Sequence, residues 1–134
     1  MNADPLKFAR FSGPFHALLR IAAGLSFMSH GTMKLLGVPA APADMGAMPV
    51  SPLSFMGATG LLELVGGLLV LIGLFTRPAA FLLAGEMAVA FWMVHAPNGI
   101  VPATNMGEAA YLYCFVFLFL SAAGAGPYAL DNRK

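Results

Sequence analysis

The sequence predicts an all-α integral membrane protein in which four helices cross a lipid bilayer as a bundle. Hydrophobic residues make up 59% of the 134 residues and charged residues only 10%, whereas soluble domains carry roughly 25% charged residues. A soluble chain of this length leaves too much surface exposed to hide so many apolar side chains. The apolar residues also fall into four segments, each close to the ~20 residues that a membrane-spanning helix needs.

We expect a single domain over residues 1–134, with membrane spans at about 14–36, 54–75, 79–95 and 108–125. Stretches rich in Gly and Pro separate most of these segments and are typical of loops. Between the second and third spans, Thr76-Arg77-Pro78 predicts a tight turn, which would make these spans antiparallel neighbours. Small residues in the same two spans favour close helix packing; they are Gly60, Gly66, Gly67, Gly73, Ala80, Ala84 and Ala88.

The distribution of Lys and Arg predicts the orientation of the spans, because cytoplasmic loops are enriched in both residues. One side of the predicted membrane carries Lys7, Arg10, Arg77, Arg133 and Lys134. The other side carries only Lys34, at the end of the first span. We therefore expect both termini in the cytoplasm, with the loops at 37–53 and 96–107 outside.

Charge and cysteine content exclude several classes of function. The formal net charge is only +1, so the chain offers no basic surface for nucleic acid and we expect no nucleic-acid partner. Cys114 is the single cysteine, which excludes an internal disulfide, a CxxC pair and a thiolate metal cluster. Four-helix thiol oxidoreductases, which need a pair of cysteines, are excluded for the same reason.

Two glutamates lie within the predicted spans. A charged residue at the centre of a membrane costs roughly 2.5–3.5 kcal/mol on insertion scales, so such residues usually have a partner or a function. Glu63 is nine residues from Ser54, and Glu86 is nine residues from His95, the outer ends of their spans. At 1.5 Å per residue both lie ~14 Å deep. If both face inward, they could pass protons or hydrogen-bond a quinone oxygen, or they could be neutral acids that link helices.

The first span supplies cations that could meet these carboxylates. His30 and Lys34 are four residues apart and therefore share one face of a helix. Lys34 can either extend outward to the membrane surface or reach inward on its long side chain. We expect His30 to be a hydrogen-bonded interior histidine. Arg20, about four turns away, is expected to extend to cytoplasmic lipid head groups.

Methionine and histidine residues gather on the predicted outer side of the membrane. Thioether and imidazole groups suit Cu(I), so Met45, Met48 and His95 are candidate metal ligands, although Met is also an ordinary packing residue. A bis-histidine haem would need His30 and His95 to face each other. Haem is less favoured, because His95 lies at a helix end beside Pro97, where exposure is the simpler interpretation.

Three stretches of the sequence carry a family resemblance. Residues 20–24 read RIAAG, residues 29–35 read SHGTMKL, and residues 63–80 read ELVGGLLVLIGLFTRPAA. They resemble the DoxX family of small four-helix proteins of the bacterial inner membrane, whose pattern E-x-x-G-G-x-x-L-x-x-G-x-x-T-R-x-A-A matches the third stretch. The resemblance implies that His30, Lys34, Glu63 and Arg77 fall on characteristic positions of the family. It also implies a link to thiosulfate:quinone oxidoreductase or to other membrane oxidoreductase complexes, although no residue here is suited to sulfur chemistry.

These observations lead to one main interpretation of function and two alternatives. The chain is expected to be a redox-associated subunit with a quinone-binding or proton-handling site formed by His30, Lys34, Glu63, Glu86 and Arg77. The alternatives are a non-enzymatic carrier of a small molecule or of Cu(I), and a structural partner of a membrane complex. Expected partners are the lipid bilayer and either an oxidoreductase complex or a second copy of the chain. The sequence assigns no catalytic residue.

Overall fold

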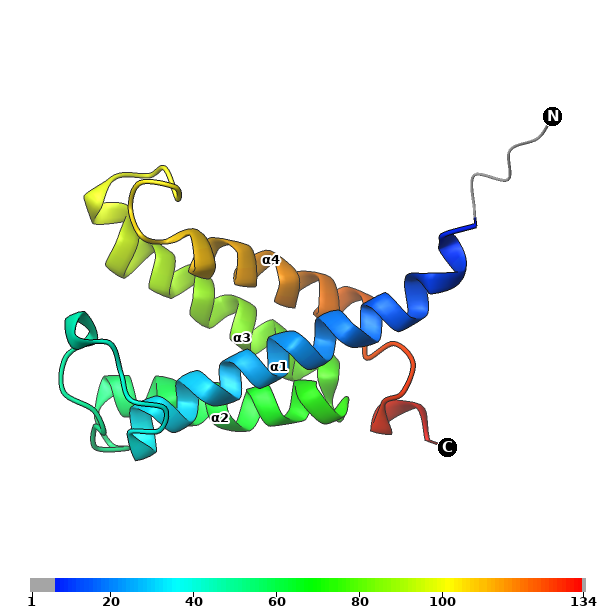
Figure 1. Cartoon of the computed structure of the whole chain (residues 1–134), viewed down its shortest axis with the longest axis horizontal. Helices are drawn as coiled ribbons and strands as arrows, with labels where there is room; N and C mark the ends of the chain where they lie inside the picture. Colours follow the sequence, from blue (N-terminus) through cyan, green and yellow to red (C-terminus); the bar gives the residue numbers. More distant parts are fainter. Residues whose placement is uncertain (1–6, 134) are drawn as a thin grey trace.

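Four helices account for most of the chain in the computed structural model, which describes residues 7–133 (Figure 1). They are α1 (Ser12–Leu36), α2 (Phe55–Ile72), α3 (Thr76–Ala90) and α4 (Glu108–Ala123). Within these described residues there is no β-strand, so the predicted all-α class with four helices is confirmed. Residues 1–6 and Lys134, which the charge count includes, lie outside the described residues.

Local signals in the sequence define the ends of α1 and α2. Gly37 ends α1 in a left-handed backbone conformation, with φ 68°. A residue with a side chain would adopt this conformation only at a cost in free energy. The Ser54 side chain precedes α2 and accepts a hydrogen bond from the N–H of Gly57 at 3.0 Å, which satisfies one of the free donors at the helix start. Gly73, with φ 70°, ends α2 in the same way as Gly37 ends α1.

The start of α3 differs from the prediction. Residues 76–78 form the first turn of α3, and the connection from α2 occupies residues 73–75. Pro78 is compatible with this position, because the N–H groups of a first helical turn have no partner within the helix. Beyond Ala90 the helical path continues through a π-helical turn (Phe91–His95) and a short 3₁₀ turn (Ala96–Asn98).

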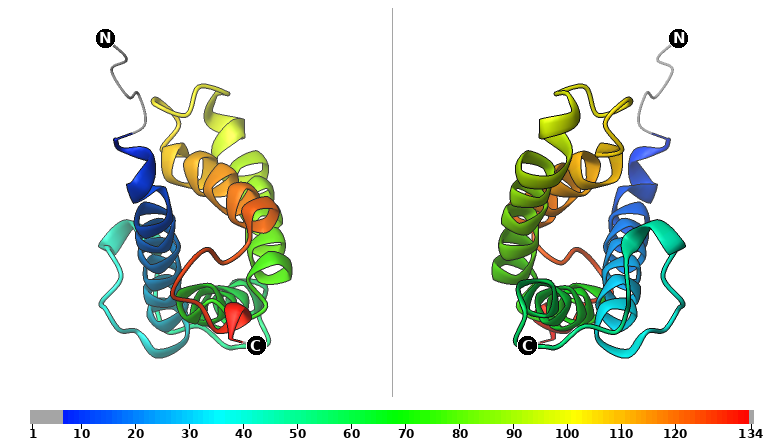
Figure 2. Two further views of the ribbon diagram at one scale, coloured as in Figure 1. Left: turned by 90° about the vertical axis from the view of Figure 1, so that its right-hand side faces the viewer. Right: turned by 90° about the vertical axis from the view of Figure 1, so that its left-hand side faces the viewer.

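The helices are arranged as two antiparallel hairpins, α1 with α2 and α3 with α4, which diverge from each other (Figures 1 and 2). We call the end with the two long connections, residues 37–54 and 99–107, the loop end. The opposite end carries the turn at 73–75 and the tail at 124–133, and we call it the tail end. α2 and α3 also contact each other, for example where Leu83 packs against Gly66. The predicted contact between these two helices is therefore present.

The hydrophobic core lies where the hairpins meet. Its large fully buried side chains are Phe27, Val70, Leu83, Phe117 and Leu120. The rings of Phe27 and Phe117 pack edge to face with their centroids 4.6 Å apart. Many large apolar side chains point outward instead, including Trp92 and Phe81, which are 66% and 63% exposed. Among the described residues, the helices Phe55–Ile72 and Thr76–Asn98 are long and apolar enough to cross a membrane.

Glycines bring the backbones of α1 and α2 into direct contact. A Cβ atom placed on Gly24 would lie 2.7 Å from the carbonyl oxygen of Gly67, and one on Gly31 would lie 2.7 Å from that of Gly60. No side chain can occupy such a space without moving one helix. The contact allows backbone packing without the hydrophobic drive that operates in water.

We predict that Gly24→Ala and Gly31→Ala each destabilise the fold by about 1–3 kcal/mol, because the added methyl group overpacks a backbone contact. Gly85→Ala is the matched control, since a Cβ atom at Gly85 meets no atom within 4 Å. That substitution should be neutral or stabilise by roughly 0.5–1 kcal/mol. Unfolding midpoints in detergent micelles measure all three. Equal effects at Gly31 and Gly85 would contradict the packing role of the α1–α2 glycines.

Candidate functional site

An ion pair joins α1 to α2 within the hydrophobic interior. Lys34 Nζ donates a hydrogen bond to Glu63 Oε1 at 2.8 Å and another to Thr59 Oγ1 at 3.0 Å. Lys34 and Glu63 are both buried, at 8% and 4% exposed. The Lys34 side chain therefore extends inward and not outward toward a membrane surface. The pair offsets the cost of taking two charges out of water only because the partners are in close contact.

A cavity of about 480 Å³ opens between the two hairpins toward the loop end. Lys34 and Glu63 line it from the α1–α2 hairpin, and Glu86 lines it from α3. Most of the remaining lining is aromatic or apolar; it includes Phe27, Phe55, Leu62, Val89, Ala90 and Tyr113. The two carboxylates that the sequence places within predicted spans thus border one common space.

Three carboxylate oxygens in the wall of this cavity lack a hydrogen-bond partner among residues 7–133. They are Oε2 of Glu63 and both oxygens of Glu86, and all three are buried. Buried polar atoms are nearly always hydrogen-bonded in folded proteins. The exceptions therefore mark this wall as a place where a bound molecule can supply the missing donors.

The candidate ligands of a metal or haem lie around the same cavity, with one exception. Met45, His30 and His95 line it, whereas Met48 is not part of the lining. His95 Nδ1 lies 3.2 Å from the carbonyl oxygen of Asn105, which fixes the ring at the loop end. No group of three or more His, Cys, Asp or Glu residues in the described part of the chain is placed to hold a metal ion.

The expectation of a hydrogen-bonded His30 is wrong for the described residues, among which its ring finds no hydrogen-bond partner. The ring instead packs edge-on against Phe27, with the centroids 6.1 Å apart, and borders the cavity. Its nitrogens therefore remain available to a molecule in that space.

Arg20 serves a different purpose from the one predicted. It is only 1% exposed, so it does not extend to lipid head groups. Its guanidinium donates hydrogen bonds to the carbonyl groups of Ala125, Pro127 at 3.1 Å and Tyr128 at 3.0 Å. The tail after α4 has no helical partners for these carbonyls, and the five donors of an arginine can satisfy several of them at once.

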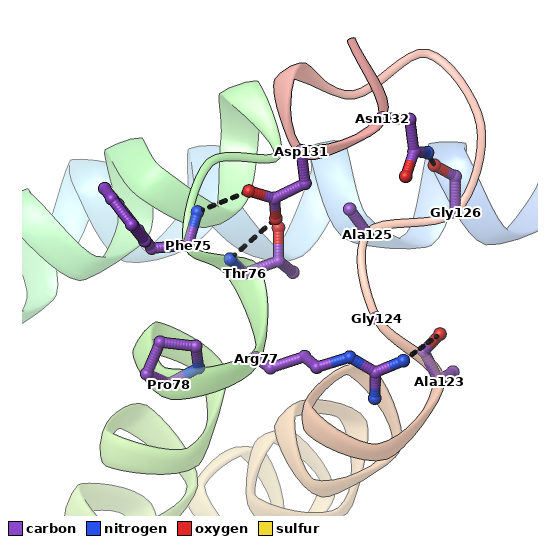
Figure 3. A pocket seen from close by; sticks show the side chains of 10 residues that line it. All are labelled: Phe75, Thr76, Arg77, Pro78, Ala123, Gly124, Ala125, Gly126, Asp131 and Asn132. Carbon is purple, nitrogen blue, oxygen red and sulfur yellow. Dashed lines mark hydrogen bonds between the residues drawn. The ribbon is translucent and has the colours of Figure 1, made fainter. Parts of the chain in front are cut away.

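Arg77 lies at the tail end and does not line the cavity of Glu63 and Glu86. It donates hydrogen bonds to the carbonyl groups of Ser121 at 3.1 Å and Ala122 near the end of α4. A further hydrogen bond goes to the carbonyl group of Ala123, the last residue of the helix (Figure 3). A cation at this position also interacts favourably with the helix dipole. The structure thus separates Arg77 from the other four residues of the predicted polar site.

Asp131 completes the tail end by holding the start of α3. Its carboxylate accepts hydrogen bonds from the N–H of Phe75 at 2.8 Å and of Thr76 at 3.0 Å (Figure 3). Burial alone would raise the pKa of this carboxyl group, but the hydrogen bonds from Thr76 and Phe75 and the charge of Arg20 together hold the pKa below its usual value. The ionised form is therefore the one that this arrangement stabilises.

Comparison with known proteins connects this geometry to a family. The family model described as DoxX matches residues 15–96. The chain belongs to the DoxX family. It is 40% identical over 122 residues to an uncharacterized protein of Haemophilus influenzae, covering 89% of this chain and 90% of that one. No solved structure matches the chain. Family membership and the apolar helices together identify a DoxX-like membrane protein that resides in a lipid bilayer.

Two residues of this DoxX protein have roles that simple sequence reasoning misses. Thr59, which accepts a hydrogen bond from Lys34, is four residues before Glu63 and therefore on the same helix face. That spacing is a signal that could identify it. The role of Arg20 depends on the path of a tail more than 100 residues away, so no local pattern could reveal it.

We predict that Lys34→Met destabilises the protein by about 3–5 kcal/mol, because it leaves the Glu63 carboxylate buried without its cation. The double variant Lys34→Met/Glu63→Gln should recover much of this loss, since it also removes the stranded charge. Arg133→Met, at an exposed cation, is the control and should have little effect. Thermal unfolding in micelles compares the variants. Equal stability of Lys34→Met and the unmodified protein would show that the ion pair does not stabilise the fold.

Proposed function

We propose that the chain is a single-domain, multi-pass protein of the bacterial inner membrane, with all four helices crossing the bilayer and both termini in the cytoplasm. Three observations support this arrangement. The outward faces of the helices carry large apolar side chains. The two long loops share the loop end, while the tail and the turn at 73–75 share the opposite one (Figure 1). Most Lys and Arg residues fall on the tail side, as expected of a cytoplasmic face.

Thiol labelling tests this orientation. In a Cys114→Ala background, a cysteine introduced as Ala103→Cys at the loop end should react with a membrane-impermeant maleimide in intact spheroplasts. A cysteine introduced as Asn132→Cys at the tail end should react only after the membrane is permeabilised. Ala103 and Asn132 are both exposed, so each new thiol is accessible from its own side. The opposite labelling pattern would show that the orientation is reversed.

We further propose that the cavity binds a molecule of the quinone class and that the chain is a redox-associated subunit. The observation that carries this proposal is a polar cluster, Lys34, Glu63 and Glu86, set in the wall of a cavity that is lined mainly by apolar and aromatic side chains. A volume of about 480 Å³ lies within the range typical of small-molecule sites, which combine apolar walls with a few polar groups. A quinone needs this combination, because its ring and tail are apolar and its two oxygens are polar.

The two alternative functions, a copper carrier and a structural partner, account for fewer features of the structure. A copper site at Met45 and Met48 would require both thioethers to face one space, yet only Met45 borders the cavity. A purely structural partner of a larger complex would not account for a cavity with buried carboxylates in its wall. The quinone proposal uses the cavity, its apolar lining and its polar cluster together.

Quinone content tests the proposal directly. We predict that the protein, purified from its native membrane, retains quinone in near-stoichiometric amounts, counting the oxidised and reduced forms together. Gly85→Leu should lower this content severalfold, because Gly85 lines the cavity and has open space at its Cβ position. Ala22→Leu, at an exposed site on α1 outside the cavity, is the matched control and should retain the full content. Quinone-free protein, or equal content in both variants, would refute the proposal.

A further inference from the structure

The cavity wall presents three buried carboxylate oxygens that have no hydrogen-bond donor among the described residues. Glu63 is paired with Lys34 and therefore carries a negative charge, but the ion pair occupies only Oε1, while Oε2 has no partner among the described residues. An ionised carboxylate can only accept hydrogen bonds. The free oxygen of Glu63 thus requires a donor from whatever occupies the cavity.

Several hydrogen-bond donors near this oxygen already have acceptors. Two hydrogen bonds of the Lys34 ammonium go to Glu63 and Thr59, and the hydroxyl of Tyr113 donates to Ser26 at 2.7 Å. Glu86 adds two more buried oxygens without a partner in the described chain. Glu86 contributes at most one donor, even when it is protonated. Lys34 has one further N–H, and the His30 ring also borders the cavity. When Glu86 is ionised, its two oxygens and Glu63 Oε2 make three buried acceptors that lack a donor among the described residues.

We propose, on the basis of the quinone-binding function above, that the cavity selects the reduced hydroquinone over the oxidised quinone. The two forms share the same ring and tail, so they fill the apolar part of the cavity equally well. They differ at the ring oxygens, which are hydroxyl donors in the hydroquinone and carbonyl acceptors in the quinone. Glu63 Oε2 and Glu86 accept the two ring hydroxyls of the reduced form.

The oxidised form meets the same wall unfavourably. A quinone carbonyl next to Glu63 Oε2 places two acceptors together with no hydrogen between them, and both lose their bonds to water. A hydrogen bond to a charged acceptor contributes enough to stability to change a dissociation constant by about tenfold or more. Sites that are built to bond a hydroxyl group reject analogues that lack it for the same reason.

Binding of three matched ligands to the purified full-length protein in lipid nanodiscs tests this selectivity. The ligands are a decyl-substituted benzoquinone, its hydroquinone, and the dimethyl ether of that hydroquinone, measured by equilibrium titration under anaerobic conditions. The ether keeps the aromatic ring and both oxygens but cannot donate a hydrogen bond. We expect the hydroquinone to bind about tenfold or more tightly than either the quinone or the ether.

Two variants test whether Glu86 contributes to the preference for hydroquinone. Glu86→Gln replaces a carboxylate with an amide that also donates, so the preference for hydroquinone over quinone should shrink severalfold. Glu108→Gln makes the same change at an exposed glutamate outside the cavity and should leave the preference unchanged. If the quinone or the ether binds as tightly as the hydroquinone, the selectivity is refuted while quinone binding stands. If none of the three binds, both the selectivity and the proposed function are refuted.

Discussion

The close contact between the backbones of α1 and α2 determines where the side chains of the site lie. Gly24 on α1 meets Gly67 on α2, and Gly31 on α1 meets Gly60 on α2. The two glycines of each helix are seven residues apart, so the helices stay close over about two turns. A Cβ atom on Gly60 would lie only 3.0 Å from the Cβ atom of Lys34. The lysine side chain therefore passes directly over this glycine. A larger residue there would displace the ammonium group from Glu63.

Most of the polar contacts that tie the helices and the tail together lie at the tail end, away from the cavity. At the tail end, Arg20 holds the tail after α4, Asp131 joins that tail to the start of α3, and Arg77 joins α3 to the end of α4. Nearer the loop end, the hydrogen bond between Tyr113 and Ser26 joins α4 to α1. The hairpins diverge toward the loop end (Figure 1), and the residues that line the cavity, including both carboxylates, lie there.

The sequence predicts those parts of this structure that depend on residues close together in the chain. Long apolar runs identify the helices. The positions of Glu63 and Glu86 in their spans predict one common depth, but only the structure shows that both line one cavity. The start of α3 is mispredicted because its first N–H groups are bonded by Asp131, about 55 residues away. Arg20 is misassigned because the carbonyls that it bonds belong to a tail without helical pattern. In both cases the deciding partner is distant in sequence.

The two carboxylates in the cavity wall have different relationships to the fold. Glu63 has a cation and is part of the contact between α1 and α2, so its loss would disturb folding as well as any bound molecule. Glu86 has no partner in the described chain, and a buried polar group without a partner costs stability.

The surroundings of Glu86 show that the fold itself does not need this carboxylate. Its helix packs through Ala80, Leu83, Ala84 and Met87, so an apolar side chain at position 86 would serve packing at least as well. Its presence fits the binding of a molecule in the cavity, as proposed above. Because Glu86 contributes nothing to the α1–α2 contact, recognition of that molecule at α3 can be altered without dismantling the fold. A substitution at Glu63 would change both the cavity wall and the contact between α1 and α2.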